Sequence, residues 1–245
     1  MFSCQQAQKT HPCMKSLVGV YKSLFPIRIT GYIGELLNDE VRKFSASLPA
    51  GTKLLDAGAG HLDWKRYFPQ CDYKSLDICY PENKLEEKRL DYIADLENMP
   101  EVPSNYFDAI IFISVLEHVK HPDKAIKEIW RILKPGGRLF LQTSRATADH
   151  QIPNNFFNFT PYGLRLLLEE AGFTPGDIRN TGGYFSFIGD KLTNFWFFFG
   201  DGYLMKIMDL ITYPLLFLIK LVMIYLDKFD KEKTLSANII AEAIK

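Results

Sequence analysis

The stretch Lys53-Leu54-Leu55-Asp56-Ala57-Gly58-Ala59-Gly60 decides the fold of this chain. A short apolar run ends in an acid and then in two glycines one residue apart, which is typical of a strand that breaks into a tight turn. Glycine has no Cβ, so backbone amides can approach a ligand closely and the chain can reach positive φ without strain. If a helix follows, its unpaired N–H groups face the same ligand. The pattern therefore predicts a nucleotide-like binding turn at Gly58 and Gly60.

Two further acids support that prediction. A second predicted strand begins at Tyr73 and ends in an acid at Asp77, 21 residues after Asp56, the spacing at which doubly wound folds place a carboxylate on ribose hydroxyls. A third segment, 91–96, carries Asp95 just before a turn. The carboxyl ends of neighbouring parallel strands meet at one edge of a sheet, so we expect all three carboxylates at the same edge.

Composition limits the class of protein. The chain has 245 residues and 47% hydrophobic content, which suits one α/β domain with a substantial core and an appendage. Lysine plus arginine and aspartate plus glutamate both number 29, so the zero net charge gives no indication of a nucleic-acid partner. We therefore expect no nucleic-acid partner.

The cysteines and the amino terminus indicate a compartment. Four cysteines show neither a Cys-x-x-Cys pair nor a histidine at zinc-finger spacing, which favours free thiols in a reducing environment and predicts no metal site. The first residues lack a basic segment followed by an apolar one, so we expect no secretory signal. Both observations favour a cytoplasmic location.

Periodicity and breaker residues predict an alternation of helices and strands. Helices are expected at Tyr32–Leu48, from Leu116 to Leu133, and from Thr160-Pro161 to Gly172. Strands are expected at Lys53–Ala57, Tyr73–Ile78, 91–96, Phe107–Ser114, Arg138–Thr143, within Phe173–Thr181, and at Ser236–Ile244. The Phe107–Ser114 run is almost wholly apolar, as expected of a central parallel strand buried on both faces.

With these segments assembled, the chain resembles the class I S-adenosylmethionine-dependent methyltransferases of the small-molecule type. Leu55-Asp56-Ala57-Gly58-Ala59-Gly60 is similar to their first motif, and Leu133-Lys134-Pro135-Gly136-Gly137 is the most specific match. The resemblance implies an α/β fold, a seven-stranded, mostly parallel Rossmann-like sandwich with an antiparallel last strand. It also implies S-adenosyl-L-methionine as cofactor. The cofactor-binding residues that it implies are Asp56, Gly58, Gly60, Asp77, Ile78, Asp95, Leu96 and Ser114.

The expected chemistry follows from that cofactor. A methyl group on a positively charged sulfur is already activated, so the protein mainly aligns the acceptor and excludes water. A general base is needed only if the acceptor keeps a proton of high pKa, and His118 and His150 are the candidates, each with an ordinary structural role as the alternative. The resemblance implies a small-molecule or lipid-linked acceptor, such as a sugar or a quinone. We expect it to enter over the loop 145–159, where Arg145 and two asparagines can hold polar groups and three phenylalanines can cover the methyl group.

Two other functions use the same fold. A nicotinamide-dependent oxidoreductase also needs a glycine turn and an acid on the ribose, but its third glycine would fall at position 63, where this chain has Asp63. The second alternative is a non-catalytic scaffold that binds a membrane or a partner. Calorimetry with S-adenosylmethionine and with NAD distinguishes the methyltransferase, the oxidoreductase and the non-catalytic scaffold.

A hydrophobic insertion interrupts the domain. The predicted division is an N-terminal helical segment (1–50), a methyltransferase domain (51–183 and 234–245) and a helical insertion (184–233). Leu210 to Leu226, 17 residues long, would reach roughly 25 Å as a helix, short of a hydrocarbon core of about 30 Å. Its polar residues fall on one narrow stripe: Lys206, Asp209, Tyr213, Lys220 and Asp227. Such a helix suits peripheral contact with the cytoplasmic face of a membrane, a homodimer, or a cap over the domain's own core.

Overall fold

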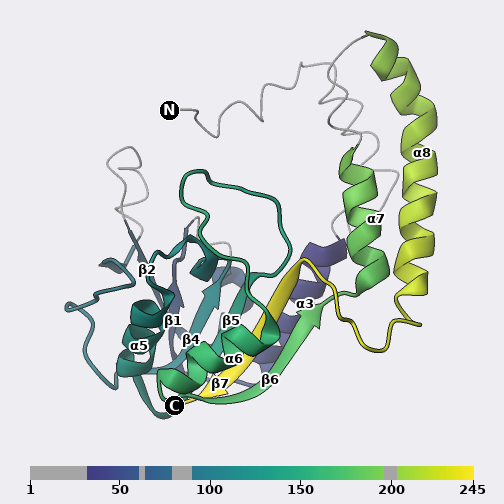
Figure 1. Ribbon diagram of the computed structural model, residues 1–245. Coiled ribbons are helices and arrows are strands. Elements are labelled where there is room, and N and C mark those ends of the chain that lie inside the picture. The colour runs from purple at the N-terminus through teal and green to yellow at the C-terminus, as the bar shows by residue number, and fades with distance from the viewer. Residues whose placement is uncertain (1–31, 61–63, 79–89, 196–202) are drawn as a thin grey trace. The chain divides into compact units, whose positions relative to one another are not determined.

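The computed structural model describes residues 32–60, 64–78, 90–195 and 203–245 (Figure 1), with side chains described outside 193–195 and 203–214. Several sequence predictions concern residues outside these ranges. They are the position Asp63 and three of the four cysteines, Cys4, Cys13 and Cys79. The fourth, Cys71, is a free thiol, as predicted.

The chain divides into two compact units. One comprises Met1–Leu37 with Gly182–Leu235, and the other comprises Asn38–Thr181 with Ser236–Lys245. The sequence prediction had placed a boundary at residue 50. The boundary instead falls inside the first described helix, α3 (Tyr32–Ala46).

The larger unit holds a seven-stranded sheet whose strand order is β3-β2-β1-β4-β5-β7-β6. The first five strands of this order run parallel, while β7 is antiparallel to both β5 and β6. This confirms the predicted fold class. The strands are β1 (Lys53–Ala57), β2 (Asp72–Asp77), β3 (Tyr92–Ile93), β4 (Phe107–Ile113), β5 (Leu133–Ser144), β6 (Thr174–Thr181) and β7 (Asn238–Ile244).

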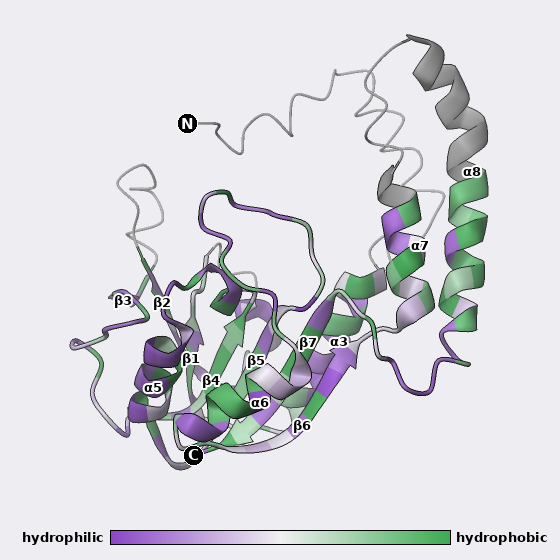
Figure 2. Cartoon of the chain, viewed as in Figure 1, coloured by the Kyte–Doolittle hydropathy of each residue, from purple (hydrophilic) through white to green (hydrophobic). Residues whose placement is uncertain are grey.

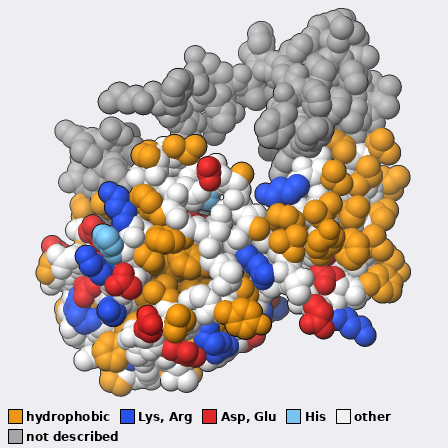
Figure 3. Space-filling model, in the orientation of Figure 1, with side chains coloured by type: hydrophobic (Ala, Val, Ile, Leu, Met, Phe, Trp, Pro, Cys, Tyr) orange, Lys and Arg blue, Asp and Glu red, His pale blue; other side chains and the backbone are white. Residues whose placement is uncertain are grey.

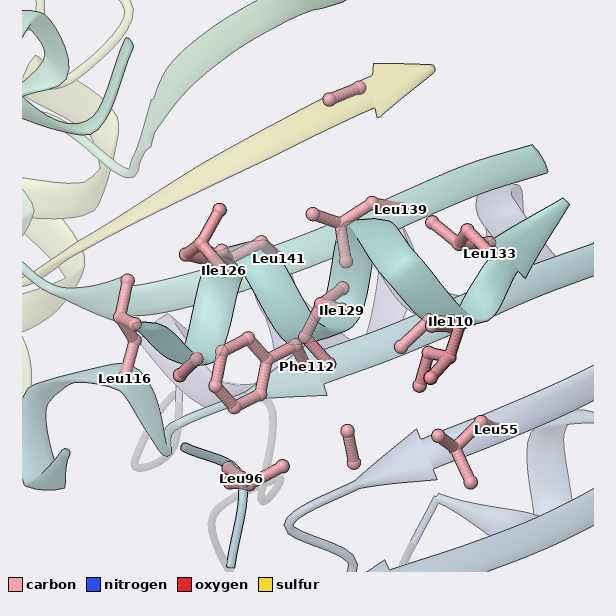
Figure 4. Close-up of a cluster of buried hydrophobic side chains, with 14 of the residues drawn as sticks. Leu55, Leu96, Ile110, Phe112, Leu116, Ile126, Ile129, Leu133, Leu139 and Leu141 are labelled. Carbon is pink, nitrogen blue, oxygen red and sulfur yellow. The ribbon is translucent and has the colours of Figure 1, made fainter. Parts of the chain in front are cut away.

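Helices cover both faces of the sheet. On one face lie α5 (Pro122–Ile132) and α6 (Pro161–Glu170), as Figure 1 shows. Their apolar side chains meet those of β1, β4 and β5 in the core cluster drawn in Figure 4, where Leu55, Ile110, Phe112, Ile126, Ile129 and Leu141 are all fully buried. On the other face, Phe44 of α3 packs on Phe140 of β5 with ring centroids 5.1 Å apart. Burial on both faces explains why β4 is apolar along its whole length.

The helix expected from Leu116 to Leu133 is wrong at its start. Leu116–His118 form a single 3₁₀ turn, η3, and α5 begins only at Pro122. Proline has no N–H to donate but suits the first turn of a helix, so it starts a new helix and separates α5 from η3. A second 3₁₀ turn, η2 (Lys65–Tyr67), follows the glycine turn.

Strand β5 begins earlier than the sequence predicts. The segment Lys134-Pro135-Gly136-Gly137 was expected to lie between α5 and the strand, yet Leu133 already pairs with Phe107 of β4. The register then shifts before Ala109, and the amide of Gly136 donates to the carbonyl of Lys245. The glycines therefore form an irregular stretch of the strand.

The smaller unit contains a helical hairpin of α7 (Tyr184–Phe195) and α8 (Tyr203–Leu226). Polar groups lie between the two helices. The Lys220 ammonium is 3.1 Å from Asp190 and only 7% exposed, and the Asp227 carboxylate accepts hydrogen bonds from the amides of Gly183 and Ser186 at the start of α7. The predicted polar stripe, at Lys220 and Asp227, thus faces α7 rather than water.

The outward face of the hairpin is apolar. Leu215, Leu218, Val222 and Tyr225 of α8, followed by Phe229, are between 48% and 66% exposed. They recur at intervals of three and four residues, so they form one stripe, which we call the outer stripe. Figure 2 shows this part of α8 as mainly hydrophobic, and Figure 3 shows apolar side chains gathered over the described part of the hairpin. Among the described residues, no helix is both long and apolar enough to cross a membrane.

Candidate functional site

A cavity of about 600 Å³ opens at the carboxyl ends of β1, β2 and β4. Seven of the eight predicted cofactor-binding residues line it, together with His118. They are Gly58, Gly60, Asp77, Ile78, Asp95, Leu96 and Ser114. Open α/β sheets bind ligands at this edge, in the crevice where the strand order reverses, here between β1 and β4.

The glycine turn after β1 forms one wall of the cavity. Gly58 has φ +81°, and a Cβ at this position would lie 2.3 Å from Cγ2 of Val115. No side chain fits there without displacing Val115. The amides of Gly58 and Ala59 both donate to the carbonyl of Leu76, at 2.8 and 3.0 Å, so the turn is fixed to the end of β2.

Asp77 joins the glycine turn to the second strand. Its Oδ2 accepts from the amide of Gly60 and its Oδ1 from the amide of Ile78, both at 2.6 Å. A carboxylate oxygen can accept more than one hydrogen bond, so a carboxylate at this position can also accept from a ligand hydroxyl in the cavity. The structure thus brings together the two features that the sequence singled out, the glycines and the second acid.

Asp95 and Leu96 form the opposite wall. Asp95 Oδ1 accepts from the amide of Glu97 at 2.9 Å, which closes a tight turn. The segment that follows is fixed by α5: Arg131 donates to the carbonyls of Met99 and Val102, while Glu128 accepts from the amide of Met99. Hydrogen bonding to the Arg131 guanidinium lowers the pKa of the Glu128 carboxyl, so this pair stays ionised at neutral pH.

Ser114, directly after β4, has φ +57°, a left-handed conformation that serine rarely adopts. Two hydrogen bonds to Gln142 of β5 hold it there: its amide donates to the Gln142 carbonyl at 3.0 Å and its hydroxyl to Oε1 at 2.7 Å. This turn directs the chain from β4 into η3.

Glu117 of η3 connects three parts of the chain near the cavity. Its buried carboxylate accepts from the hydroxyls of Thr143 and Ser144, both at 2.8 Å, at the end of β5. Its backbone carbonyl accepts from the amides of Phe156 and Phe157 in the loop after β5. Glu117 therefore holds the loop after β5 and the end of β5 against η3. No sequence pattern indicated this role.

The two predicted catalytic histidines lie side by side. Their ring centroids are 4.8 Å apart and the rings are nearly perpendicular. The Nδ1 of His118 is 2.5 Å from the carbonyl of Asn154, and the Nδ1 of His150 is 3.0 Å from the carbonyl of Ala148. A carbonyl can only accept, so Nδ1 carries a proton in both rings, and in the neutral form of each ring Nε2 has a lone pair. His118 lines the cavity, whereas His150 contacts the ring of His118 and is not part of the cavity lining.

Two predictions about individual residues need correction. Asp56 does not line the cavity, because its buried carboxylate accepts a hydrogen bond from the hydroxyl of Tyr73. Arg145 donates to Asn180, so its guanidinium is bound to β6. Of the three loop phenylalanines, Phe156 lines the cavity, and Phe159 packs against the core.

Other residues of the cavity wall were not predicted. They include Leu90, Glu97, Val115, Val119, Gln151 and Asn154. Val115 follows Ser114 directly and shares its turn, so its position was available from the sequence. Gln151 and Asn154 reach the cavity only through contacts between the loop and η3, which no local pattern encodes.

The fold and the cavity define the class: this is a Rossmann-like methyltransferase fold with its site at the carboxyl ends of the parallel strands. A family model described as "Methyltransferase domain" matches residues 29–176, more than half of the chain. The chain belongs to this methyltransferase-domain family. Family membership favours methyl transfer over the nicotinamide-dependent alternative.

Curated relatives agree with this assignment. The chain is 31% identical over 147 residues to a tRNA (carboxymethyluridine(34)-5-O)-methyltransferase of Arabidopsis thaliana, covering 58% of this chain and 35% of that protein. It is 49% identical over 110 residues to the ubiquinone/menaquinone biosynthesis C-methyltransferase UbiE of Chromobacterium violaceum, covering 40% and 45%. The chain thus spans less than half the length of each of these two relatives.

Solved structures share the fold. The 1,6-didemethyltoxoflavin-N1-methyltransferase of Burkholderia thailandensis aligns with 96% of this chain and 91% of its own, at a TM-score of 0.50 and 15% identity. Phosphoethanolamine N-methyltransferase 2 of Haemonchus contortus aligns with 85% and 52%, at a TM-score of 0.54 and 17% identity.

Proposed function

We propose that this protein transfers a methyl group from S-adenosylmethionine to a lipid-linked acceptor, and that the α7–α8 hairpin attaches it to a membrane surface. Membership of the methyltransferase-domain family supports the reaction class. The proposal of a lipid-linked acceptor rests on the hairpin, whose charged side chains are buried between the helices while the apolar outer stripe is exposed.

The cavity suits the cofactor in size and chemistry. About 600 Å³ is within the usual range of small-molecule sites. Gly58 packs against Val115 where a Cβ would clash, so a side chain at position 58 would displace Val115, which also lines the cavity. Asp77 offers the two acceptor oxygens that a ribose diol needs. The Burkholderia thailandensis and Haemonchus contortus structures hold S-adenosylhomocysteine and S-adenosylmethionine respectively, which adds support.

Bound there, the cofactor supplies a methyl group on a positively charged sulfur. The chain's residues hold and shield the reactants: Asp77 and the glycine turn position the cofactor, and Phe156 with Val115 covers the cavity from water. An acceptor that keeps a proton needs a base, and the free Nε2 lone pair of His118 or His150 meets that requirement.

The hairpin has the polarity of a structure that sits in an apolar medium. Chains in water place charges outside and apolar groups inside, but here Lys220 and Asp227 are buried between the helices while the outer stripe is exposed. Polar groups that face inward and pair with one another are the arrangement found where lipid surrounds a helix. The UbiE relatives, by their printed name, act in ubiquinone and menaquinone biosynthesis, so a lipid acceptor has a precedent in the family.

Liposome flotation tests the membrane attachment. The full chain should float with neutral phosphatidylcholine liposomes, and the variant L215S/L218S/V222S should stay at the bottom of the gradient. The control Y162S/L166S removes two equally exposed apolar residues from α6 and should float like the parent. If the parent stays at the bottom, as a soluble dimer or as a monomer, the membrane assignment is wrong.

The acceptor class has its own test. The protein is incubated with methyl-labelled S-adenosylmethionine and with either a total lipid extract or an aqueous extract of the cells. We expect label in the lipid fraction. Label confined to the aqueous fraction would contradict the lipid-linked acceptor while confirming methyl transfer.

A further inference from the structure

We propose that Glu117, His118 and His150 bind one divalent transition-metal ion at the wall of the cavity. Each residue offers a ligand atom, and the three atoms all lie within 4.8 Å of one another. The residues come from two segments, η3 and the loop after β5, so the fold assembles them. The sequence predicted no metal site, because no spacing pattern joins Glu117-His118 to His150.

The orientation of the two imidazoles supports a metal site. Histidines that bind metals usually donate their second ring N–H to a carboxylate, a backbone carbonyl or water, which fixes the tautomer. His118 and His150 both do so, through the carbonyls of Asn154 and Ala148. The nitrogen left over in each ring, Nε2, is the one with a lone pair to give to a metal.

The carboxylate of Glu117 is supported in the same way. Thr143 and Ser144 donate one hydroxyl hydrogen bond to each of its oxygens. Each oxygen keeps a lone pair, so metal binding does not require these bonds to break. In the part of the chain that the structure describes, this buried carboxylate forms no ion pair with lysine or arginine, and a bound cation would balance its charge.

The donor set selects the kind of ion. Two imidazoles and one carboxylate suit zinc, manganese, iron or cobalt, whereas calcium and magnesium prefer oxygen ligands alone. Ligand atoms about 2.0–2.2 Å from one ion are at most about 4.4 Å apart, so the cluster has to contract slightly. His150 is only partly buried and lies in a loop, so a small movement of its ring provides that contraction.

A metal here deepens the proposed function and rests on it. Three protein ligands leave coordination positions open, and a hydroxyl oxygen bound there loses its proton more readily. The acceptor would then be a molecule with an ionisable hydroxyl group, and its proton would pass to solvent. The two histidines would act as ligands, so neither Nε2 would serve as a base.

Metal titration tests the site directly. The full chain is treated with EDTA and titrated with ZnCl₂ by calorimetry. We expect one ion per chain in the parent, binding at least about tenfold weaker in H118Q and in H150Q, and unchanged binding in H121Q, a control with an exposed histidine close to η3. Equal binding in the parent and in both ligand variants, or no binding in the parent, would overturn the proposal.

Two more measurements keep the result interpretable. T143V removes a supporting hydroxyl without touching a ligand and should weaken zinc binding by about 10- to 100-fold, an effect that would not arise if the ion bound elsewhere. The EDTA-treated parent should still bind S-adenosylmethionine with unchanged affinity. Loss of cofactor binding in every protein would count against the proposed function, whereas the zinc titration would still decide the metal site.

Discussion

Gly58 and Val115 lie so close together that a Cβ on residue 58 would be 2.3 Å from Val115 Cγ2. The contact joins the turn after β1 to the turn after β4, and both turns line the cavity. It leads to the first prediction. Gly58→Ala should weaken S-adenosylmethionine binding at least about tenfold, which is about 1.4 kcal/mol, as measured by calorimetry.

Gly51→Ala is the matched control for that variant. Gly51 also has positive φ, at +78°, but no atom lies within 4 Å of the position of its Cβ. It should show the same backbone strain, a cost of about 1 kcal/mol, with unchanged cofactor affinity. The double variant G58A/V115A should recover part of the lost affinity. Equal affinity of G58A and G51A would contradict a role of the glycine turn in binding.

Asp77 is predicted to hold the ribose of the cofactor. Asp77→Ala removes an acceptor worth about 1.5 to 3 kcal/mol for each hydrogen bond to a charged group, and also frees the amide of Gly60. We expect cofactor affinity to fall at least about tenfold. Asp72→Ala, an exposed acid at the start of the same strand, should leave affinity unchanged. Equal affinities in the two variants would mean that Asp77 does not bind the ribose.

The Glu128–Arg131 pair predicts a pH dependence of stability. Arg131 lowers the pKa of Glu128 in the folded state, so the pair stabilises the fold above the unfolded pKa of about 4.3, and this contribution is lost as pH falls through the folded pKa. Glu128→Gln should cost about 1 to 3 kcal/mol at pH 7, and progressively less below pH 4. Denaturant unfolding at both pH values measures the difference. A cost that does not depend on pH would show that the charge of Glu128 contributes nothing.

Lys245 supports the carboxyl end of α5. Its ammonium donates to the carbonyls of Trp130 and Leu133, both at 2.7 Å, and lies 3.9 Å above the Trp130 ring. Lys245→Met should lower the free energy of unfolding by about 1 to 3 kcal/mol, because carbonyls at the end of the helix lose their donor. Lys124→Met, on the exposed first turn of the same helix, should change it by less than about 0.5 kcal/mol. Similar losses in both variants would exclude a specific role for Lys245.

Local sequence predicted most of the sheet, because strand ends follow from apolar runs and the residues that break them. β1 has the predicted limits, and β2 differs by one residue at each end. The start of β5 was missed because Leu133 pairs with Phe107, which is distant in the chain. The break before α5 was encoded in Pro122 but was outweighed by the apolar pattern around it.

The site was predicted as far as it depends on strand ends. Glycines and acids that follow strands line the cavity, since a parallel sheet brings such residues to one edge. Asp56 was misplaced because its side chain points into the interior, where Tyr73 binds it. Glu117 and His150 come together only because the loop after β5 folds back against η3. The spacing of these residues in the sequence does not predict that fold of the loop.

The hydrogen bonds from Gly183 and Ser186 to Asp227 close the hairpin at its base. The strands on either side of it, β6 and β7, are paired at Thr181 and Asn238, so their ends also lie next to each other. A short turn between those two residues would join the strands with the same order and direction. The hairpin is thus a module that could be gained or lost in evolution without changing the strand order of the sheet. The entropy cost of closing so long a connection between β6 and β7 is offset mainly by contacts within the module.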